Sequence, residues 1–153
     1  PDPLKCAAEV KRVLKPGGRF AFTVWADASE HPLLEVMFRS ISERLSVPYE
    51  AASKPFTFGP LSRLTALLSD AGYREIREET RSFEATFPSS DQWAQLTVMG
   101  AAAALPAFRD LPANERDALI PGVASDAADA IREYTRGENV VFKMTSHYAT
   151  GIV

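Results

Sequence analysis

Four polar side chains of this 153-residue chain stand where they could move or polarise a proton. Asp27 and Glu30 follow the apolar run that ends at Trp25, and a carboxylate at that place could act as a general base. His147 and Tyr148 lie together near the end of the sequence and could polarise a hydroxyl group, although such a pair in a strand more often faces solvent. These residue types and spacings assign a firm catalytic role to none of the four.

Large apolar side chains are a second group of candidates, because they could line a pocket for a small molecule. Trp25 ends an apolar run, and ligands of open α/β sheets collect at the carboxyl ends of strands. Its ring could therefore wall a pocket, with burial in the core as the alternative. The other candidates lie in or beside predicted helices, where burial is the commoner role: Phe56, Phe58, Trp93 and Met99.

The residues near the start of the sequence predict a helix. Asp2 can accept hydrogen bonds from the first free N–H groups of a helix, and Pro3 suits the first helical position. Apolar residues then recur at helical spacing and form one stripe: Cys6, Val10, Val13 and Leu14. We therefore expect Cys6 to be a packed thiol rather than a nucleophile, and a single cysteine builds no disulfide framework.

A strand is predicted directly after this helix. Pro16 cannot continue the helix, and Gly17 and Gly18 allow the positive φ values of a sharp turn. Residues 20–25 (Phe-Ala-Phe-Thr-Val-Trp) are an almost unbroken apolar run. Such a run is typical of a strand covered on both faces in a parallel sheet, so this strand needs neighbours.

The middle of the chain reads as two helices joined by a loop. Pro32 opens the first helix, which runs to residue 46 and carries apolar residues at helical spacing. Residues 47–55 are predicted to be a loop. The second helix is rich in leucine, opens at Pro60 and closes at Gly72.

Two long strands are predicted on either side of a helical insertion. Residues 73–87 carry many charges in their first half, which suits the edge of a sheet, and residues 140–153 form the last strand. The insertion, residues 88–139, holds a helix capped by Ser89 or Ser90. A second helical stretch, residues 114–134, is expected to kink or break at Pro121-Gly122, with an apolar stripe of Ile120, Val123, Ala127, Ile131 and Tyr134.

Two ordered matches make the chain resemble class I S-adenosylmethionine-dependent methyltransferases, most nearly the ubiquinone/menaquinone-biosynthesis type. Asp2-Pro3, Glu9 and residues 13–25 resemble the fourth helix and fifth strand of that family. Residues 56–60, with the leucines that follow and Ala71-Gly72-Tyr73, resemble its approach to the sixth strand. The resemblance implies the α/β fold class and a Rossmann-like three-layer sheet. In it, residues 73–87 lie outermost and residues 140–153 insert antiparallel between them and residues 20–25.

The family holds its cofactor on a Gly-x-Gly-x-Gly loop, and this chain has no Gly-x-Gly. The resemblance therefore implies the C-terminal half of a methyltransferase domain, as a single partial domain with residues 88–139 as a cap within it. S-adenosylmethionine would be the cofactor of the full-length parent, and we expect none to bind this chain. Asp2 would lie near the methionine end of the cofactor, although a helix cap is the simpler explanation for it.

The resemblance also implies a small-molecule acceptor in the parent enzyme and an isolated chain that is inactive. An unprotected side of strand 20–25 predicts a homodimer. The net charge of −3, with signs interspersed, gives nucleic-acid binding little support. The sequence contains no apolar stretch of about twenty residues that could span a membrane, and we expect a cytoplasmic protein. The competing hypothesis is a non-catalytic module for a small ligand or for dimerisation, and a different doubly wound enzyme such as a dehydrogenase is weaker.

Overall fold

The computed structural model describes residues 2–153 and divides the chain into two compact units. The first unit contains the described part of Pro1–Asp27 together with Phe58–Ser82 and Thr145–Val153. The second unit contains Ala28–Thr57 and Phe83–Met144. The predicted insertion, residues 88–139, lies within the second unit. Helices and an open antiparallel sheet together place the chain in the α/β class that the sequence predicted.

Three strands form the main sheet, in the order β1 (Arg19–Trp25), β4 (Asn139–Ile152), β2 (Arg74–Phe87). β4 is antiparallel to β1, with a register from Arg19↔Ile152 to Trp25↔Ser146. The prediction that the last strand lies antiparallel in the middle, with residues 73–87 at an edge, is confirmed. A short strand that the sequence did not predict, β3 (Thr135–Arg136), forms a hairpin with the start of β4.

Side-chain contacts give the direction of β2 along β4. The Thr80 hydroxyl lies 2.8 Å from His147 Nδ1, and the Ser82 hydroxyl lies 3.0 Å from that of Thr145. As residue numbers rise along β2 they fall along β4, which is the sense of an antiparallel pair.

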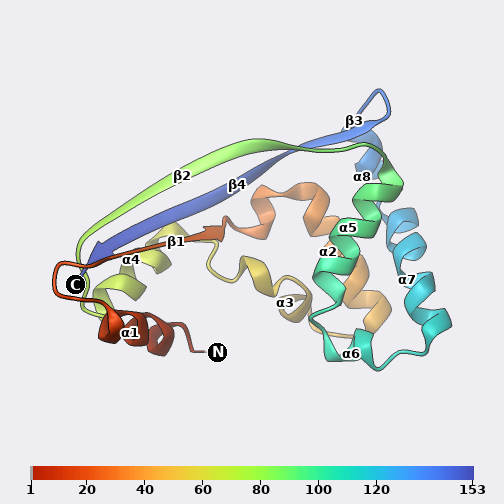
Figure 1. Ribbon diagram of the computed structural model, residues 1–153. Coiled ribbons are helices and arrows are strands. Elements are labelled where there is room, and N and C mark those ends of the chain that lie inside the picture. The colour runs from red at the N-terminus through yellow and green to blue at the C-terminus, as the bar shows by residue number, and fades with distance from the viewer. Residues whose placement is uncertain (1) are drawn as a thin grey trace. The chain divides into compact units, whose positions relative to one another are not determined.

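One face of the sheet carries the core of the first unit. α1 (Pro3–Val13) and α4 (Leu61–Asp70) pack against each other and cover the same face (Figure 1). Tyr73 extends this core, and its buried hydroxyl donates a hydrogen bond to the Ala7 carbonyl at 3.0 Å. Burial raises the pKa of Tyr73, with the nearby Cys6 as a smaller cause. The buried residues of this core are Ala7, Leu64, Leu68, Tyr73 and Ala149.

The prediction that β1 is covered on both faces is wrong. Along the strand Phe20, Phe22 and Val24 are half-buried against the helices, whereas Ala21 and Thr23 are exposed. An apolar run without polar alternation suggested two covered faces, but alanine and threonine are small enough to stand on a solvated face. Within the first unit, the described helices cover one face of this strand.

The buried stripe of α1 also differs from the predicted one. Ala7 is 3 % exposed and faces α4, while Cys6 is exposed and Val13 is 64 % exposed. Val10 and Leu14 are half-buried, so the stripe follows the spacing 7, 10, 14. The packed-thiol prediction for Cys6 is therefore wrong, because a helix turn of about 100° per residue puts neighbours 6 and 7 on different faces. Asp2 caps the helix as predicted, accepting from the backbone N–H groups of residues 4 and 5.

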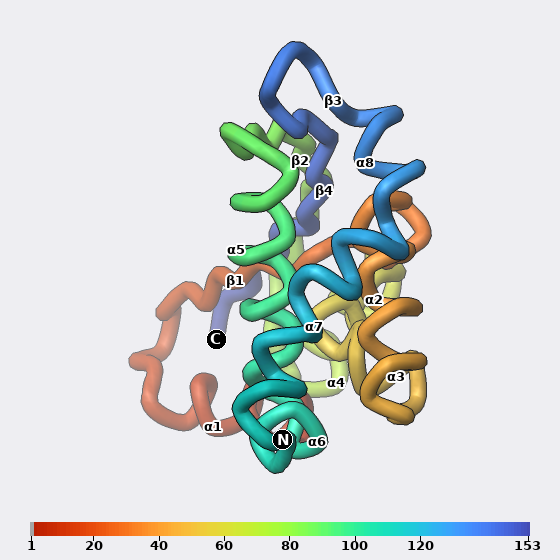
Figure 2. Tube along the Cα trace, turned by 90° about the vertical axis from the view of Figure 1, so that its right-hand side faces the viewer, coloured from red at the N-terminus to blue at the C-terminus, as the bar shows by residue number. Residues whose placement is uncertain are grey.

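Three helices form the centre of the second unit. α7 (Ala113–Asp126) packs against both α2 (Pro32–Leu45) and α5 (Ser90–Ala102), as Figure 2 shows. Ser89 caps α5 through a hydrogen bond from the Gln92 N–H, which confirms the predicted cap. Shorter helices complete the unit: η1 (Ala28–Glu30), α3 (Tyr49–Ala52), η2 (Lys54–Phe56), α6 (Pro106–Arg109) and α8 (Ala128–Glu133).

Two sequence predictions for the second unit are wrong. Residues 47–55 are not a plain loop, because α3 and most of η2 lie there. Of the predicted kink or break at Pro121-Gly122, the break is wrong, because the helix continues through both residues and ends before Ala127. Leu119 and Val123 are its buried residues, whereas Ile120 is only half-buried. Pro121 is exposed, so the helical carbonyl that loses its partner can be hydrated.

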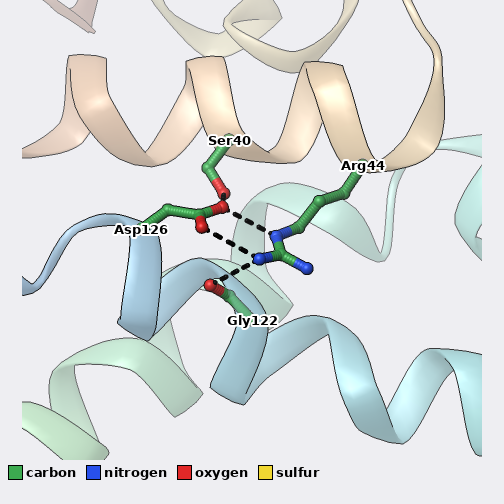
Figure 3. Close-up of polar contacts among 4 residues, drawn as sticks. All are labelled: Ser40, Arg44, Gly122 and Asp126. Carbon is green, nitrogen blue, oxygen red and sulfur yellow. Dashed lines mark hydrogen bonds and ion pairs between the residues drawn. The ribbon is translucent and has the colours of Figure 1, made fainter.

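A polar cluster braces α7 against α2 close to that proline (Figure 3). Arg44 donates to both carboxylate oxygens of Asp126, at 2.8 and 2.9 Å, and to the Gly122 carbonyl at 3.0 Å. Ser40 donates to the same carboxylate at 2.5 Å. The bonds from Arg44 and then Ser40 lower the pKa of Asp126, and the carboxylate raises the pKa of Arg44. We call these four residues the Arg44 brace.

Candidate functional site

A group of described polar residues in the first unit lies around His147, near the carboxyl end of β1. β4 places His147 opposite Val24 in the register, and the side chain is only 5 % exposed. Its Nε2 lies 2.9 Å from the Gly59 carbonyl and its Nδ1 lies 2.8 Å from the Thr80 hydroxyl. Because a carbonyl only accepts, Nε2 carries the proton, and in the neutral ring Nδ1 accepts from Thr80.

Gly59 connects this histidine to Asp27, the residue that follows Ala26 at the end of β1. A Cβ atom added to Gly59 would lie 2.5 Å from Asp27 Cα and 2.7 Å from Asp27 Oδ2. These distances are shorter than van der Waals contact, so only glycine permits the approach. Ala26 is fully buried and donates a hydrogen bond to the Thr145 carbonyl at 3.0 Å, which extends the β1–β4 pairing.

The arrangement around His147 fixes positions rather than offering a free base. Both ring nitrogens of His147 already have partners within the unit, and the sequence expectation that it faces solvent is wrong. Tyr148 points to the other face, where Arg81 lies over its ring at 5.4 Å. The exposed carboxylate here belongs to Asp27. We name His147, Thr80, Gly59 and Asp27 the His147 cluster.

Three further sequence-predicted site residues belong to the first unit. Trp25 is half-buried at the end of β1 and pairs in register with Ser146. Phe58 is half-buried against the core of α1, α4 and β1. Asp2 uses its carboxylate to cap α1, which is the alternative that the sequence left open. A role for any of these three in binding stays a prediction.

Three further predicted residues belong to the second unit. Phe56 is buried, and its ring meets those of His31 and Phe38 edge-on, with centroids 5.1 and 5.2 Å apart. Trp93 is fully buried, and its indole N–H has no hydrogen-bond partner among the described residues. Met99 lies on the same helix and is 36 % exposed. Their role in substrate binding also stays a prediction.

The sequence did not predict that Gly59 and Thr80 contact His147, or that His31 contacts Phe56. A Gly-Pro pair such as Gly59-Pro60 signals a turn, but the close approach to Asp27 depends on segments far apart in the sequence. Buried His31, 1 % exposed, gave no pattern that separates it from a solvent-facing histidine.

The described residues show neither a metal centre nor a membrane helix. Within residues 2–153, no group of three or more His, Cys, Asp or Glu side chains is placed to hold a metal ion. Over the same range, every helix is too short or too polar to cross a bilayer.

Comparisons with known proteins give one kind of match. No family model matches the sequence, and no curated protein matches it. Among solved structures, a crystal structure of a Bacillus halodurans C-125 protein that is provisionally assigned as a methyltransferase is similar, with 15 % sequence identity and a TM-score of 0.47. The alignment covers 98 % of this chain and 62 % of the other, so this chain spans less than two thirds of that neighbour's length. A similarity at this identity and TM-score assigns no activity to this chain.

Proposed function

We propose that this chain is the acceptor-side, C-terminal part of an S-adenosylmethionine-dependent methyltransferase that acts on a small molecule. One observation carries the proposal, namely the strand order β1-β4-β2 with β4 antiparallel in the middle. The resemblance of the sequence to class I methyltransferases, ubiquinone/menaquinone type, requires this order for its fifth, seventh and sixth strands.

The helices support the same assignment. α1 precedes β1 through the turn at Gly17, where φ is 79°, and α4 precedes β2 through Gly72, where φ is 77°. Both helices pack on one face of the sheet, as helices that connect neighbouring strands do. These are the two places where the sequence carries the family's residues, so local sequence and topology agree.

The residues present do not fit the methyl donor itself. No Gly-x-Gly occurs in the sequence, and Asp2, the one candidate near the cofactor, uses its carboxylate as a helix cap. The parent enzyme would supply that pocket from elsewhere, and the isolated chain would neither bind S-adenosylmethionine with useful affinity nor turn over.

The contribution of this chain would be to hold the acceptor. Displacement at a sulfonium methyl group needs the acceptor in line at near-attack distance, and a base if the acceptor carries a proton. Trp25 would wall the acceptor pocket at the carboxyl end of β1, and Phe58 would support it. Asp27, which lies directly against Gly59 beside the His147 contact, would be the carboxylate that takes a proton there.

A homodimer through the free edge of β1 is part of the proposal. β1 stands at one end of the strand order, and β4 is its paired neighbour in the described chain. Its sequence places no proline, and no lysine, along this edge to discourage pairing. Leu4 and Val13 of α1 are also exposed, at 43 % and 64 %. A second copy of the chain could cover both the edge and these side chains.

The sequence of the complete reading frame tests this proposal most cheaply. We expect a Gly-x-Gly-x-Gly loop upstream of Asp2, directly after an apolar strand, with an acidic residue at the end of the next strand. The product of that frame should transfer tritium from methyl-labelled S-adenosylmethionine to a small acceptor. An unrelated upstream sequence would contradict the proposal and favour the alternative, a non-catalytic module for a small ligand or for dimerisation.

A further inference from the structure

The second unit contains a groove whose chemistry the proposed methyl transfer does not use. One wall is formed by α3 and η2, the other by the end of α5 and the start of α6. Its volume is about 660 Å³, which lies within the usual range of small-molecule sites. Both walls carry mainly small or apolar residues, among them Ala51, Pro55, Gly100, Ala101 and Ala104.

Small side chains leave the groove open at its α5 wall. A Cβ atom added to Gly100 would have no heavy atom within 4 Å. Glycine is a weaker helix former than alanine, so residue 100 is a glycine at some cost to the stability of α5. No packing contact in the second unit requires that glycine, so a larger side chain would project into free space.

The groove offers an excess of hydrogen-bond acceptors. At the end of α5, the N–H of Leu105 bonds to the Ala102 carbonyl, and the N–H of Ala103 bonds to the carbonyl of Met99. Within residues 2–153, the intervening carbonyls of Gly100 and Ala101 receive no hydrogen bond from beyond the helix end. The negative end of the α5 dipole lies at the same place.

The opposite wall of the groove also carries hydrogen-bond acceptors without donors. The helical partner of the Ala51 carbonyl would be the N–H of residue 55, which is a proline and has none. The carboxylate of Glu50 has no ion-pair partner among the described residues. Among the described groove residues Lys54 is the one cation, and it also has no ion-pair partner, but its four-methylene stem lets the ammonium turn towards water.

We infer that this groove binds a small molecule with an apolar body and a protonated amine. The apolar body lies on the alanine and glycine residues of both walls. The ammonium group donates hydrogen bonds to the Glu50 carboxylate and to the open carbonyls at the end of α5. Three donors on one cation match an acceptor-rich rim better than a neutral or anionic group does.

Three naphthalene probes of matched size test this assignment by ¹H–¹⁵N NMR titration of the chain without any methyl donor. They are 2-naphthylethylamine, 2-naphthylethanol and 2-naphthylacetate, which differ in charge. A ligand of about 13 heavy atoms with ordinary efficiency gives a Kd of about 1 mM for the amine. We expect the alcohol to bind roughly five- to tenfold more weakly and the acetate more weakly still.

Substitutions separate charge from shape. Glu50→Gln should bring the amine Kd to that of the alcohol, and Lys54→Met should tighten amine binding a few-fold. Gly100→Phe should weaken all three probes at least tenfold by filling the groove, whereas Gln95→Phe, on another face of α5, should change none. Because these titrations contain no donor, their outcome does not depend on the proposed methyl transfer.

Three results would overturn the assignment: an acetate Kd at or below the amine Kd, an amine Kd unchanged in Glu50→Gln, or full binding to a folded Gly100→Phe variant. If Gly100→Phe does not fold, nuclear Overhauser contacts decide the question in the unmodified chain. Contacts between the naphthyl ring and the Ala101 and Ala104 methyl groups support the groove. Their absence at saturating amine refutes it.

Discussion

Substituting Gly122 by alanine tests how the Arg44 brace joins α2 to α7. A Cβ atom at this position would lie 2.4 Å from Arg44 Nη1 and 2.5 Å from its Cζ. Two bonds to Asp126 and one to the Gly122 carbonyl hold the guanidinium in this position. Because the new Cβ atom would overlap it, the guanidinium cannot stay there. Alanine at residue 122 therefore displaces the guanidinium from its carboxylate.

Two opposing free-energy terms set the size of the effect. Replacing a helix-interior glycine by alanine normally stabilises a protein by about 1 kcal/mol. The Arg44–Asp126 pair has side chains 38 % and 42 % exposed, so solvent screening limits its worth to about 1 kcal/mol even with bidentate geometry. We expect Gly122→Ala to change the free energy of unfolding by roughly zero in the parent chain.

The same substitution has a different effect once the arginine is removed. In an Arg44→Ala background there is no guanidinium to displace, so Gly122→Ala should stabilise by about 1 kcal/mol. Urea denaturation followed by Trp93 fluorescence, in a Trp25→Phe background, reports on the second unit. Gly100→Ala is the matched control, because its Cβ meets open space and should stabilise equally with or without Arg44.

Equal effects of Gly122→Ala in the two backgrounds would refute this reasoning. A coupling free energy near zero would mean that the guanidinium moves aside at no cost and that the brace contributes nothing. A coupling of about 1 kcal/mol would assign that stability to the contacts drawn in Figure 3.

Three further predictions concern the core, pH and assembly. Tyr73→Phe should destabilise the chain by about 1 kcal/mol in urea, because the buried Ala7 carbonyl loses its hydrogen bond, and an unchanged midpoint would contradict that. The lowered pKa of Asp126 adds stability that is present above about pH 4 and lost as pH falls through the folded-state pKa. Asp126→Asn should therefore flatten the pH dependence of stability in that acid range, and an unaltered acid slope would exclude the effect. Light scattering should give twice the 16.8 kDa chain mass. Thr23→Lys places a charge at an exposed position of β1 and should lower the measured mass. Monomer mass for the unsubstituted chain would refute the dimer.

Much of the fold could be predicted because its signals are local. Pro3 after Asp2, Pro60 before the leucine-rich helix and Gly72 after it specify helix ends through backbone chemistry alone. The charged residues of β2 indicated a sheet edge, and the strand order agrees. The order itself came from the resemblance, since local propensities do not say which strands pair.

The errors arise where a distant contact decides between local possibilities. Cys6 and Ala7 are equally acceptable in a buried stripe, and the position of α4 selects Ala7. Pro121-Gly122 predicted a kink or a break, yet the helix does not break there, and Arg44 from another helix donates a hydrogen bond to the Gly122 carbonyl.

The candidate site was predictable in type but not in arrangement. Trp25 and Asp27 were located by the rule that ligands collect at the carboxyl ends of strands. The contacts of Gly59 with Asp27 and His147 join three separate segments, and no pattern in the sequence joins them. For the same reason His147 was expected in solvent, although it is 5 % exposed.

Calorimetric titration with S-adenosylhomocysteine tests most directly whether this chain is the acceptor-side part of a methyltransferase. The product of the complete reading frame should bind with a Kd in the micromolar range, whereas residues 1–153 alone should release no heat of binding at millimolar ligand. Micromolar binding by residues 1–153 alone would contradict the account, and so would a longer product that fails to bind.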